Sequence, residues 1–285
     1  TGRTWRHIFW SGWEAAVMFN LLCMDLRRLF RSRSFYVILA VTAVMLILVT
    51  VMAYAVADSE MMDAMEAQGA EITESDRMMS EYIHNLSQLD LMHETLGSGF
   101  LLVMTGIGMT LFVNGDFSSG FIKNICSVRP RRRDYVLSKI VLAGVYSGIL
   151  TVLSVLLMLL VPMLIQMYPA PDSISEILRY TLWMWLPHWA FGLMALVLVA
   201  LTRGSTLGII LSLVSGSGLT AALAAALGRL LRWPPLEQYF LAAVVKGVHM
   251  PESGLAPIGT VLACTIAWAA VYGIGSLLSM AKQDL

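Results

Sequence analysis

Long apolar runs dominate this chain, and the first of them, Phe35–Ala57, extends for 23 residues without a charged side chain. An α-helix needs about 20 apolar residues to cross the hydrocarbon core of a bilayer. Only 13% of the 285 residues are charged, whereas soluble domains carry about 25%. We therefore expect an all-α polytopic membrane protein rather than a soluble globular domain.

Six apolar runs are predicted to form transmembrane helices. Their ranges are Phe35–Ala57, Gly97–Asn114, Ile140–Met167, Tyr180–Leu201, Thr206–Leu227 and Ile258–Met280. We expect kinks at Pro162 and Pro187, because proline cannot donate the backbone hydrogen bond of a helix interior. The apolar core of Gly228–Pro257 is Gln238–Val245, which is too short to span. That stretch is predicted to form re-entrant or short external helices.

Basic residues predict the orientation of the spans. Outside the lead at 1–17, twelve Lys and Arg fall on the side that holds both termini, and five fall on the other. Cytoplasmic loops carry the excess of basic residues, so both ends are predicted to be cytoplasmic. Residues 18–34 carry Leu22, Leu26 and Leu29 on one face together with four arginines, which predicts an amphipathic helix against anionic headgroups. Residues 1–17 are expected to be added sequence, or to lie upstream of a start at Met18.

The loop at 58–96 is acidic, with ten Asp and Glu against the single basic residue Arg77. Methionine and leucine recur in it at partly helical spacing. This pattern predicts two short amphipathic helices on the external side, with a break near Gly69. Residues 35–285, which include this loop, are expected to form one transmembrane domain of six helices.

The loop at 115–139, which reads GDFSSGFIKNICSVRPRRRDYVLSK, is the most basic segment between two spans. Asp116 is predicted to cap a short helix that runs to Cys126, because aspartate is a favoured N-cap residue. Phe117, Phe121 and Ile122 recur at helical spacing and would form its apolar face. We expect a partner to press on the membrane domain here.

No catalytic, cofactor-binding or metal-binding residue is predicted. The chain has no G-x-x-x-x-G-K-[ST] motif, and His93-Glu94 lacks a second histidine at Gly97. The sequence around Ser215 and Ser217 does not match a serine-protease motif. Small polar residues in membrane helices usually serve packing, which is the simpler explanation for these serines. The acidic loop also carries methionines and histidines that could bind a soft metal ion such as Cu(I): Met61, Met62, Met65, His84 and His93. The better explanation is that the methionines fill the apolar faces of short helices.

Small residues predict close packing of the third and fifth helices, because they let helix backbones approach in lipid. The glycines concerned are Gly144, Gly148, Gly204, Gly208, Gly216 and Gly218. His188, beside Pro187, is predicted first as a residue of a helix kink and second as a substrate contact. Apart from Asp116 at the inner edge, no acid or lysine is expected within the membrane core. Ion-coupled transporters usually keep such a group, so we expect an external energy source.

The loop pattern D-F-x-x-G-x-I-K-N-I, followed by R-x-x-Y-x-x-S-K, resembles the ABC-2 family of ABC transporter permeases. Bacterial subunits of the bacitracin and lantibiotic self-immunity type are the most similar. The residues are Asp116, Phe117, Gly120, Ile122, Lys123, Asn124, Ile125, Arg132, Tyr135, Ser138 and Lys139. The resemblance covers the chain from Met18 onward. It implies a second permease, homo- or heterodimeric, two ATPase subunits that hold ATP and Mg²⁺, and a bacterial plasma membrane location.

The resemblance also implies that the 115–139 loop contains the coupling helix that docks on the ATPase. The residues expected to take part are Asp116, Phe117, Gly120, Phe121, Ile122, Lys123, Asn124, Arg129, Arg131, Arg132 and Arg133. The expected function is export of a hydrophobic or amphipathic cargo, such as a cationic antimicrobial peptide. The alternative is a non-transporting membrane sensor or scaffold that presents the acidic loop. Membrane lipids are expected partners, and nucleic acid is not.

Overall fold

The structure is a computed structural model that describes residues 19–128, 132–167, 169–232, 235, 237–250 and 254–282. After a helical segment at 19–29, the elements follow in this order: α2 (Arg33–Ala57), α3 (Ser59–Ala67), α4 (Glu74–Asn85), α5 (Gln88–Leu96), α6 (Phe100–Ser118), α7 (Phe121–Val128), α8 (Arg132–Leu164), α9 (Ile174–Thr202), α10 (Thr206–Gly216), α11 (Leu219–Leu231), η1 (Glu237–Tyr239), α12 (Leu241–Lys246), β1 (His249–Met250), β2 (Gly254–Leu255) and α13 (Ile258–Lys282). The lead at 1–17 and the side chains of Arg129 and Arg131 lie outside the described residues.

The chain is a polytopic, all-helical membrane protein. In its described part, five helices (α2, α6, α8, α9 and α13) are long and apolar enough to cross a bilayer, and the pair α10 and α11 would make a sixth span. This confirms the predicted fold class. The helix α8 begins inside the segment assigned to the basic loop, and α9 runs through Pro187 without a break.

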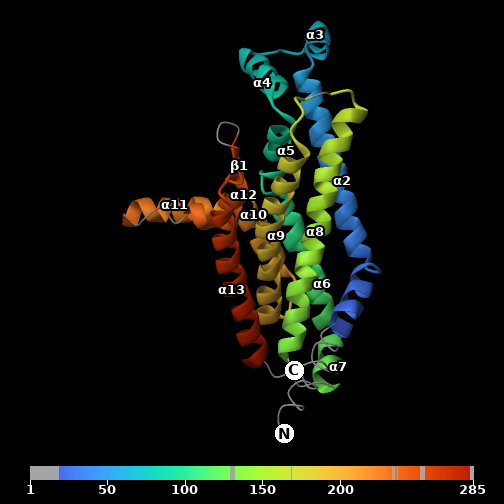
Figure 1. The fold of residues 1–285 in the computed structure, drawn as a ribbon, viewed down its shortest axis with the longest axis vertical. Coiled ribbons are helices and arrows are strands. Elements are labelled where there is room, and N and C mark those ends of the chain that lie inside the picture. Colours follow the sequence, from blue (N-terminus) through green and yellow to red (C-terminus); the bar gives the residue numbers. More distant parts are fainter. Residues whose placement is uncertain are drawn as a thin grey trace.

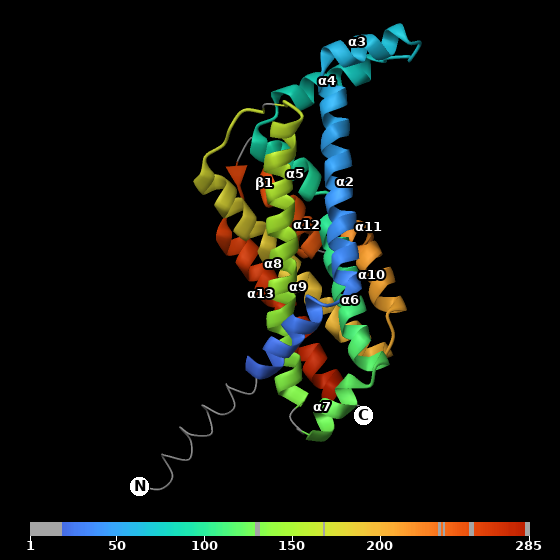
Figure 2. The ribbon, with the colours of Figure 1, turned by 90° about the vertical axis from the view of Figure 1, so that its right-hand side faces the viewer.

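The helix α9 is the centre of the bundle and packs against α6, α8 and α13. On the other side of α8, the helix α2 lies along α8 and also contacts α6 (Figure 1, Figure 2). The segment 19–29, α7 and the C-terminal end of α13 gather at one end of the molecule, and α3 and α4 lie at the other (Figure 1). Both described ends of the chain therefore lie at the α7 end. That this end faces the cytoplasm stays a prediction from the distribution of Lys and Arg.

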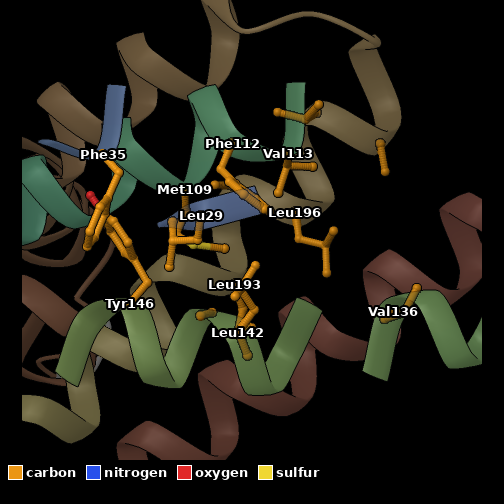
Figure 3. Close-up of a cluster of buried hydrophobic side chains, with 14 of the residues drawn as sticks. Leu29, Phe35, Met109, Phe112, Val113, Val136, Leu142, Tyr146, Leu193 and Leu196 are labelled. Atoms are coloured by element: carbon orange, nitrogen blue, oxygen red, sulfur yellow. The ribbon is translucent and has the colours of Figure 1, made fainter. Parts of the chain in front are cut away.

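Two large hydrophobic clusters fill most of the bundle, and a small third one joins α12 to α13. The cluster near the α7 end joins residues of the 19–29 segment, α2, α6, α8 and α9, and it includes Leu29, Phe112, Tyr146 and Leu196 (Figure 3). The cluster nearer the other end joins α5, α8, α9 and α12 around Met92 and Tyr180. Because lipid is as apolar as these side chains, close packing and hydrogen bonds, more than hydrophobic burial, hold the helices together.

The fifth predicted span is not one straight helix, which corrects the prediction for Thr206–Leu227. The helices α10 and α11 meet at an angle of 65°. Between them Gly218 has φ +81°, a left-handed conformation that side chains other than glycine rarely adopt. The helix α11 projects sideways from the bundle in Figure 1, so its small residues do not line a long interface with α6.

The predicted packing glycines divide by what lies next to them. A side-chain carbon at Gly208 would stand 2.6 Å from Thr110, and one at Gly216 would stand 2.5 Å from Val103, so both glycines bring α10 close to α6. Gly144 and Gly148 face Trp185 and Trp189 of α9. Gly204 has only a carbonyl oxygen at 3.8 Å. The packing role predicted for Gly204 and Gly218 is therefore replaced by roles in turns.

The acidic loop contains three helices, not two. The predicted break near Gly69 separates α3 from α4, and Gly69 has φ +94°. Thr73 and Ser87 each begin a helix by accepting a hydrogen bond from a backbone N–H, in capping boxes completed by Asp76 and Asp90. The third helix, α5, buries Leu89, Leu91, Met92, His93 and Leu96, so it belongs to the core and not to a solvated cap.

The stretch before α13 contains the expected short helices, η1 and α12, and also an antiparallel pair of strands. In this pair His249 lies opposite Leu255 and Met250 lies opposite Gly254. Two-residue strands are too short for period-two alternation to reveal them in a sequence. The strand pair leads the chain into α13, and its first strand, β1, contacts α5.

Replacing Gly216 with valine tests the α6–α10 contact. We expect Gly216→Val to lower the free energy of unfolding by about 1–3 kcal/mol, because added atoms would overlap Val103 in a close-packed site. Gly204→Val is the matched control, since a side-chain carbon there would meet only a carbonyl oxygen at 3.8 Å. Thermal unfolding in detergent compares the two variants, and equal melting temperatures would contradict the packing described here.

Candidate functional site

Four charged side chains meet at the α7 end of the bundle. Asp25 and Arg28 come from the 19–29 segment, Asp116 from α6 and Lys139 from α8. The side chains of Asp116 and Lys139 are fully buried and that of Asp25 nearly so, while Arg28 is 30% exposed. We call these four residues the buried charge cluster.

The cluster is closed by short ion pairs. Lys139 Nζ lies 2.6 Å from Asp25 Oδ1 and 2.7 Å from Asp116 Oδ2, and Arg28 Nη2 lies 2.6 Å from Asp116 Oδ1. A longer contact of 3.7 Å joins Arg28 to Asp25. Two acids therefore balance two bases, and each acid contacts both bases.

Neighbouring side chains complete the cluster. The hydroxyl of Tyr135 donates to Asp116 at 2.9 Å, and that of Ser138 donates to Asp25 at 3.1 Å. The guanidinium of Arg28 lies over the ring of Phe121 at 3.9 Å, and the ammonium of Lys139 lies 4.9 Å from the ring of Phe112. Cations are attracted to ring faces, most strongly where water is excluded, so aromatic rings of α6 and α7 also hold the two bases.

The sequence of the 19–29 segment explains its position. Leu22, Leu26 and Leu29 share one face, and this face packs against the hydrophobic cluster near α7. The segment is therefore amphipathic as predicted, and its apolar face packs on the bundle. Arg27, Arg31 and Arg33 remain exposed, and their contact with anionic headgroups stays a prediction.

The predicted cap at Asp116 is wrong. Asp116 lies inside α6, which continues to Ser118, and its carboxylate is bound to the cluster instead of to a helix N-terminus. The chain turns at Gly120, whose φ is +70°, and α7 begins at Phe121. The apolar run ends just before Asp116, and an aspartate at such a place predicts an N-cap for the next helix. In the structure its ion pairs stabilise Asp116 as part of α6 instead.

The remaining predicted loop residues lie in different surroundings. Ile122 is buried in the hydrophobic cluster and Phe117 packs against it. Lys123, Asn124 and Arg133 are exposed. Arg132 begins α8, but the structure does not describe its side chain, and Arg129 and Arg131 lie outside the described residues. Ile122 is therefore unavailable as a docking side chain while this packing holds.

Three members of the cluster are not predicted as site residues from the sequence: Asp25, Arg28 and Lys139. The sequence places Lys139 among the basic loop residues and Arg28 among the arginines of an amphipathic helix, and it predicts no role for Asp25. One signal was present: Asp25 and Arg28 are three residues apart and so lie on one side of a helix. The partner positions on α6 and α8 are 91 and 114 residues away from Asp25, and only the fold brings them together.

Pro187 and His188 lie within α9, where His188 is fully buried. Its ring Nδ1 donates to the carbonyl oxygen of Met184 in the same helix. Contact of His188 with a substrate stays a prediction. Among the described residues, no group of three His, Cys, Asp or Glu side chains is placed to bind a metal ion.

The buried charge cluster joins three segments mechanically. Removing one partner from a buried pair leaves an uncompensated charge, which destabilises proteins by about 3–5 kcal/mol. The 19–29 segment, the end of α6 and the beginning of α8 must therefore keep their relative positions or move as one body. The cluster lies directly beside α7, through Phe121.

A comparison with protein-family models finds no family that matches the sequence, and a comparison with curated proteins finds no matching relative. The functional conclusion therefore depends on the geometry of the buried charge cluster and on the sequence of the loop around α7.

Lys139→Met tests the cluster. We expect it to destabilise the protein by about 3–5 kcal/mol, because Asp25 and Asp116 would share a single base. The double variant Lys139→Met with Asp116→Asn should recover part of the loss, since the net charge returns to zero. Thermal unfolding in detergent measures each, with the exposed Lys123→Met as the control. A Lys139→Met protein as stable as this control would contradict the pairing.

Proposed function

We propose that this chain is the transmembrane permease subunit of an ATP-driven exporter in a bacterial plasma membrane. It would work with a second permease, as a homo- or heterodimer, and with two copies of a cytoplasmic ATPase. The observation that carries the proposal is the position of α7, a short helix between two spans that is tied through Phe121 to the buried charge cluster. The resemblance of the loop sequence to ABC-2 permeases supports the same reading.

The geometry around α7 suits a point where force enters the membrane domain. Ile122 anchors α7 in the hydrophobic cluster, and the exposed Lys123 faces away from it. A partner that displaces α7 would move the end of α6, and the ion pairs of Asp116 would carry this movement to α8 and to the 19–29 segment. Tilting of α6 and α8 would then open the bundle on alternate sides of the membrane.

The charge balance of the cluster supports an external energy source. Asp25 and Asp116 are each paired with Lys139 and Arg28. Such mutual neutralisation favours a rigid joint over a carboxylate that binds and releases a coupling ion. ATP and Mg²⁺ would belong to the partner subunit.

Two hollows support a hydrophobic or amphipathic cargo. A groove of about 780 Å³ runs along α8 and α9, and its walls are apolar side chains together with Trp185 and Trp189. Pro187 and His188 are not among its lining residues. At the end opposite α7, a cavity of about 700 Å³ combines Tyr54 and Met62 with the carboxylates of Asp58, Asp63 and Glu81. A cationic antimicrobial peptide or lantibiotic has matching apolar and basic parts.

Charge reversal on α7 tests the docking. We expect Lys123→Glu to reduce co-purification with the ATPase at least several-fold, because an exposed base would become an acid at the contact. Arg229→Glu, an equal reversal at the exposed end of α11, is the control and should leave co-purification unchanged. Undiminished binding by Lys123→Glu, or equal loss in both variants, would contradict α7 as the docking element.

The acidic cavity at the opposite end also supports the second candidate, a membrane sensor or scaffold. That candidate predicts that no ATPase co-purifies with the wild-type chain in stoichiometric amounts. The same pull-down therefore separates the two functions.

A further inference from the structure

A second polar cluster lies at the other end of the bundle, where α5 is held against α9 and α12. The ring of His93 bridges the two: Nε2 lies 3.0 Å from the carbonyl oxygen of Lys246, and Nδ1 lies 3.3 Å from the hydroxyl of Tyr180. A carbonyl only accepts, so Nε2 carries the proton and donates to Lys246. Nδ1 is then the acceptor, and the Tyr180 hydroxyl donates to it. In its neutral form, His93 is therefore held as one tautomer.

The fit around His93 is close. Its side chain is only 9% exposed, and a side-chain carbon at Gly97 would stand 3.1 Å from Nε2. Tyr180 is fully buried, and in the described part of the chain its hydroxyl has no hydrogen bond other than that to His93. A second proton on His93 would place two donors face to face. The hydroxyl would then have to rotate and leave its own hydrogen unpaired, which is unfavourable in a buried site.

A second contact joins α5 to the strand pair. His249 Nε2 lies 2.7 Å from Asp90 Oδ1, and the ring centroids of His249 and His93 are 5.6 Å apart. The backbone of α5 is also tied to the chain before α9, because Leu89 N–H donates to Asp172 and Gln88 N–H donates to the carbonyl of Ala170. The first turn of α5 thus has several polar anchors, whereas its last turn is held by the packing of Leu96 and by the hydrogen bonds of His93.

We propose that His93 forms an acid-sensitive latch that holds the last turn of α5 on α9 and α12 at neutral pH and releases it on acidification. The Asp90–His249 pair remains as the pivot. Because α5 leads directly into α6, release of the latch would change how the acidic helices sit on the membrane bundle. The latch goes beyond the exporter function and does not depend on it.

The charges around His93 act in both directions. Burial is the largest influence and lowers the pKa of His93, and His249 lowers it further. The hydrogen bond to Lys246 and the carboxylates of Glu94 and Asp90 raise it, but not enough to reverse the shift. Tyr82 of α4 donates to Glu94 at 2.9 Å, and Glu176 of α9 interacts with His249. These groups face the site from α4, α5, α9, α12 and β1.

The sign of the pH effect follows from this shift. In the open state His93 meets water and regains its ordinary pKa of about 6.5, whereas in the closed state its pKa is lower. The closed state is therefore fully stable above pH 6.5 and loses stability as the pH falls toward the lowered value. Burial acts to raise the pKa of Asp90, but hydrogen bonds from His249 and Ser87 leave it below its ordinary 3.8, so the pivot stays ionised.

Spin labels at the exposed positions Ser98 and Gln238 would report the latch in nanodiscs, by pulsed electron–electron distance measurement from pH 7.5 to pH 5.0. The ratio of open to closed populations should rise by up to about tenfold for each pH unit below 6.5 until the lowered pKa is reached. No change in the wild-type distance distribution over this range would overturn the proposal without any variant.

His93→Gln should remove the pH response, since glutamine keeps a donor and an acceptor but does not titrate. His84→Gln is the matched control, because His84 is exposed on α4 outside the cluster, and it should respond as the wild type does. His93→Asn serves as a second variant if His93→Gln fails to fold. A full pH response in either His93 variant would overturn the latch. Since no ATPase is present, failure here leaves the exporter proposal standing, and failed ATPase binding leaves the latch standing.

Discussion

The ion pairs of Lys139 with Asp25 and Asp116 are the constraint on which the α7 end of the structure depends. A bare charge in the membrane region is so unfavourable that charges there pair or reach water. Lys139 is fully buried, so both acids must stay within reach of it. This requirement holds the 19–29 segment and the end of α6 against α8. The joint beside α7 is a consequence of charge neutralisation.

The opposite end is held by different chemistry. There α5 packs its leucines and Met92 into the second hydrophobic cluster, and neutral or singly paired groups around His93 and Asp90 provide the specific contacts. Between the two ends, α9 contacts α6, α8 and α13, and glycines on α10 bring it against α6. The molecule therefore has a rigid, charge-locked end and an end whose main histidine contact is sensitive to protonation.

Much of the fold was predictable because lipid imposes simple rules. An apolar run of sufficient length forms a helix, since every backbone N–H and C=O must be paired inside the bilayer. The helices α2 and α13 follow their predicted ranges within two residues, and α9 begins six residues before its predicted start. The break at Gly69 was also predictable from local conformation. The bend at Gly218 was not predictable. The apolar run Thr206–Leu227 is long enough to cross a bilayer, whether or not α11 turns away from the bundle.

The sequence by itself determined that the chain is a helical membrane protein, where five of its long apolar helices lie, and where charge of each sign is concentrated. These are properties of hydropathy and charge counts, which act over neighbouring residues. The tertiary structure alone decided that Asp116 pairs with Lys139 instead of capping a helix, that Ile122 is buried, and that His93 meets Lys246 and Tyr180. These contacts join residues far apart in the chain. Which side of each helix faces its neighbour depends on packing, and packing has no signal in local composition.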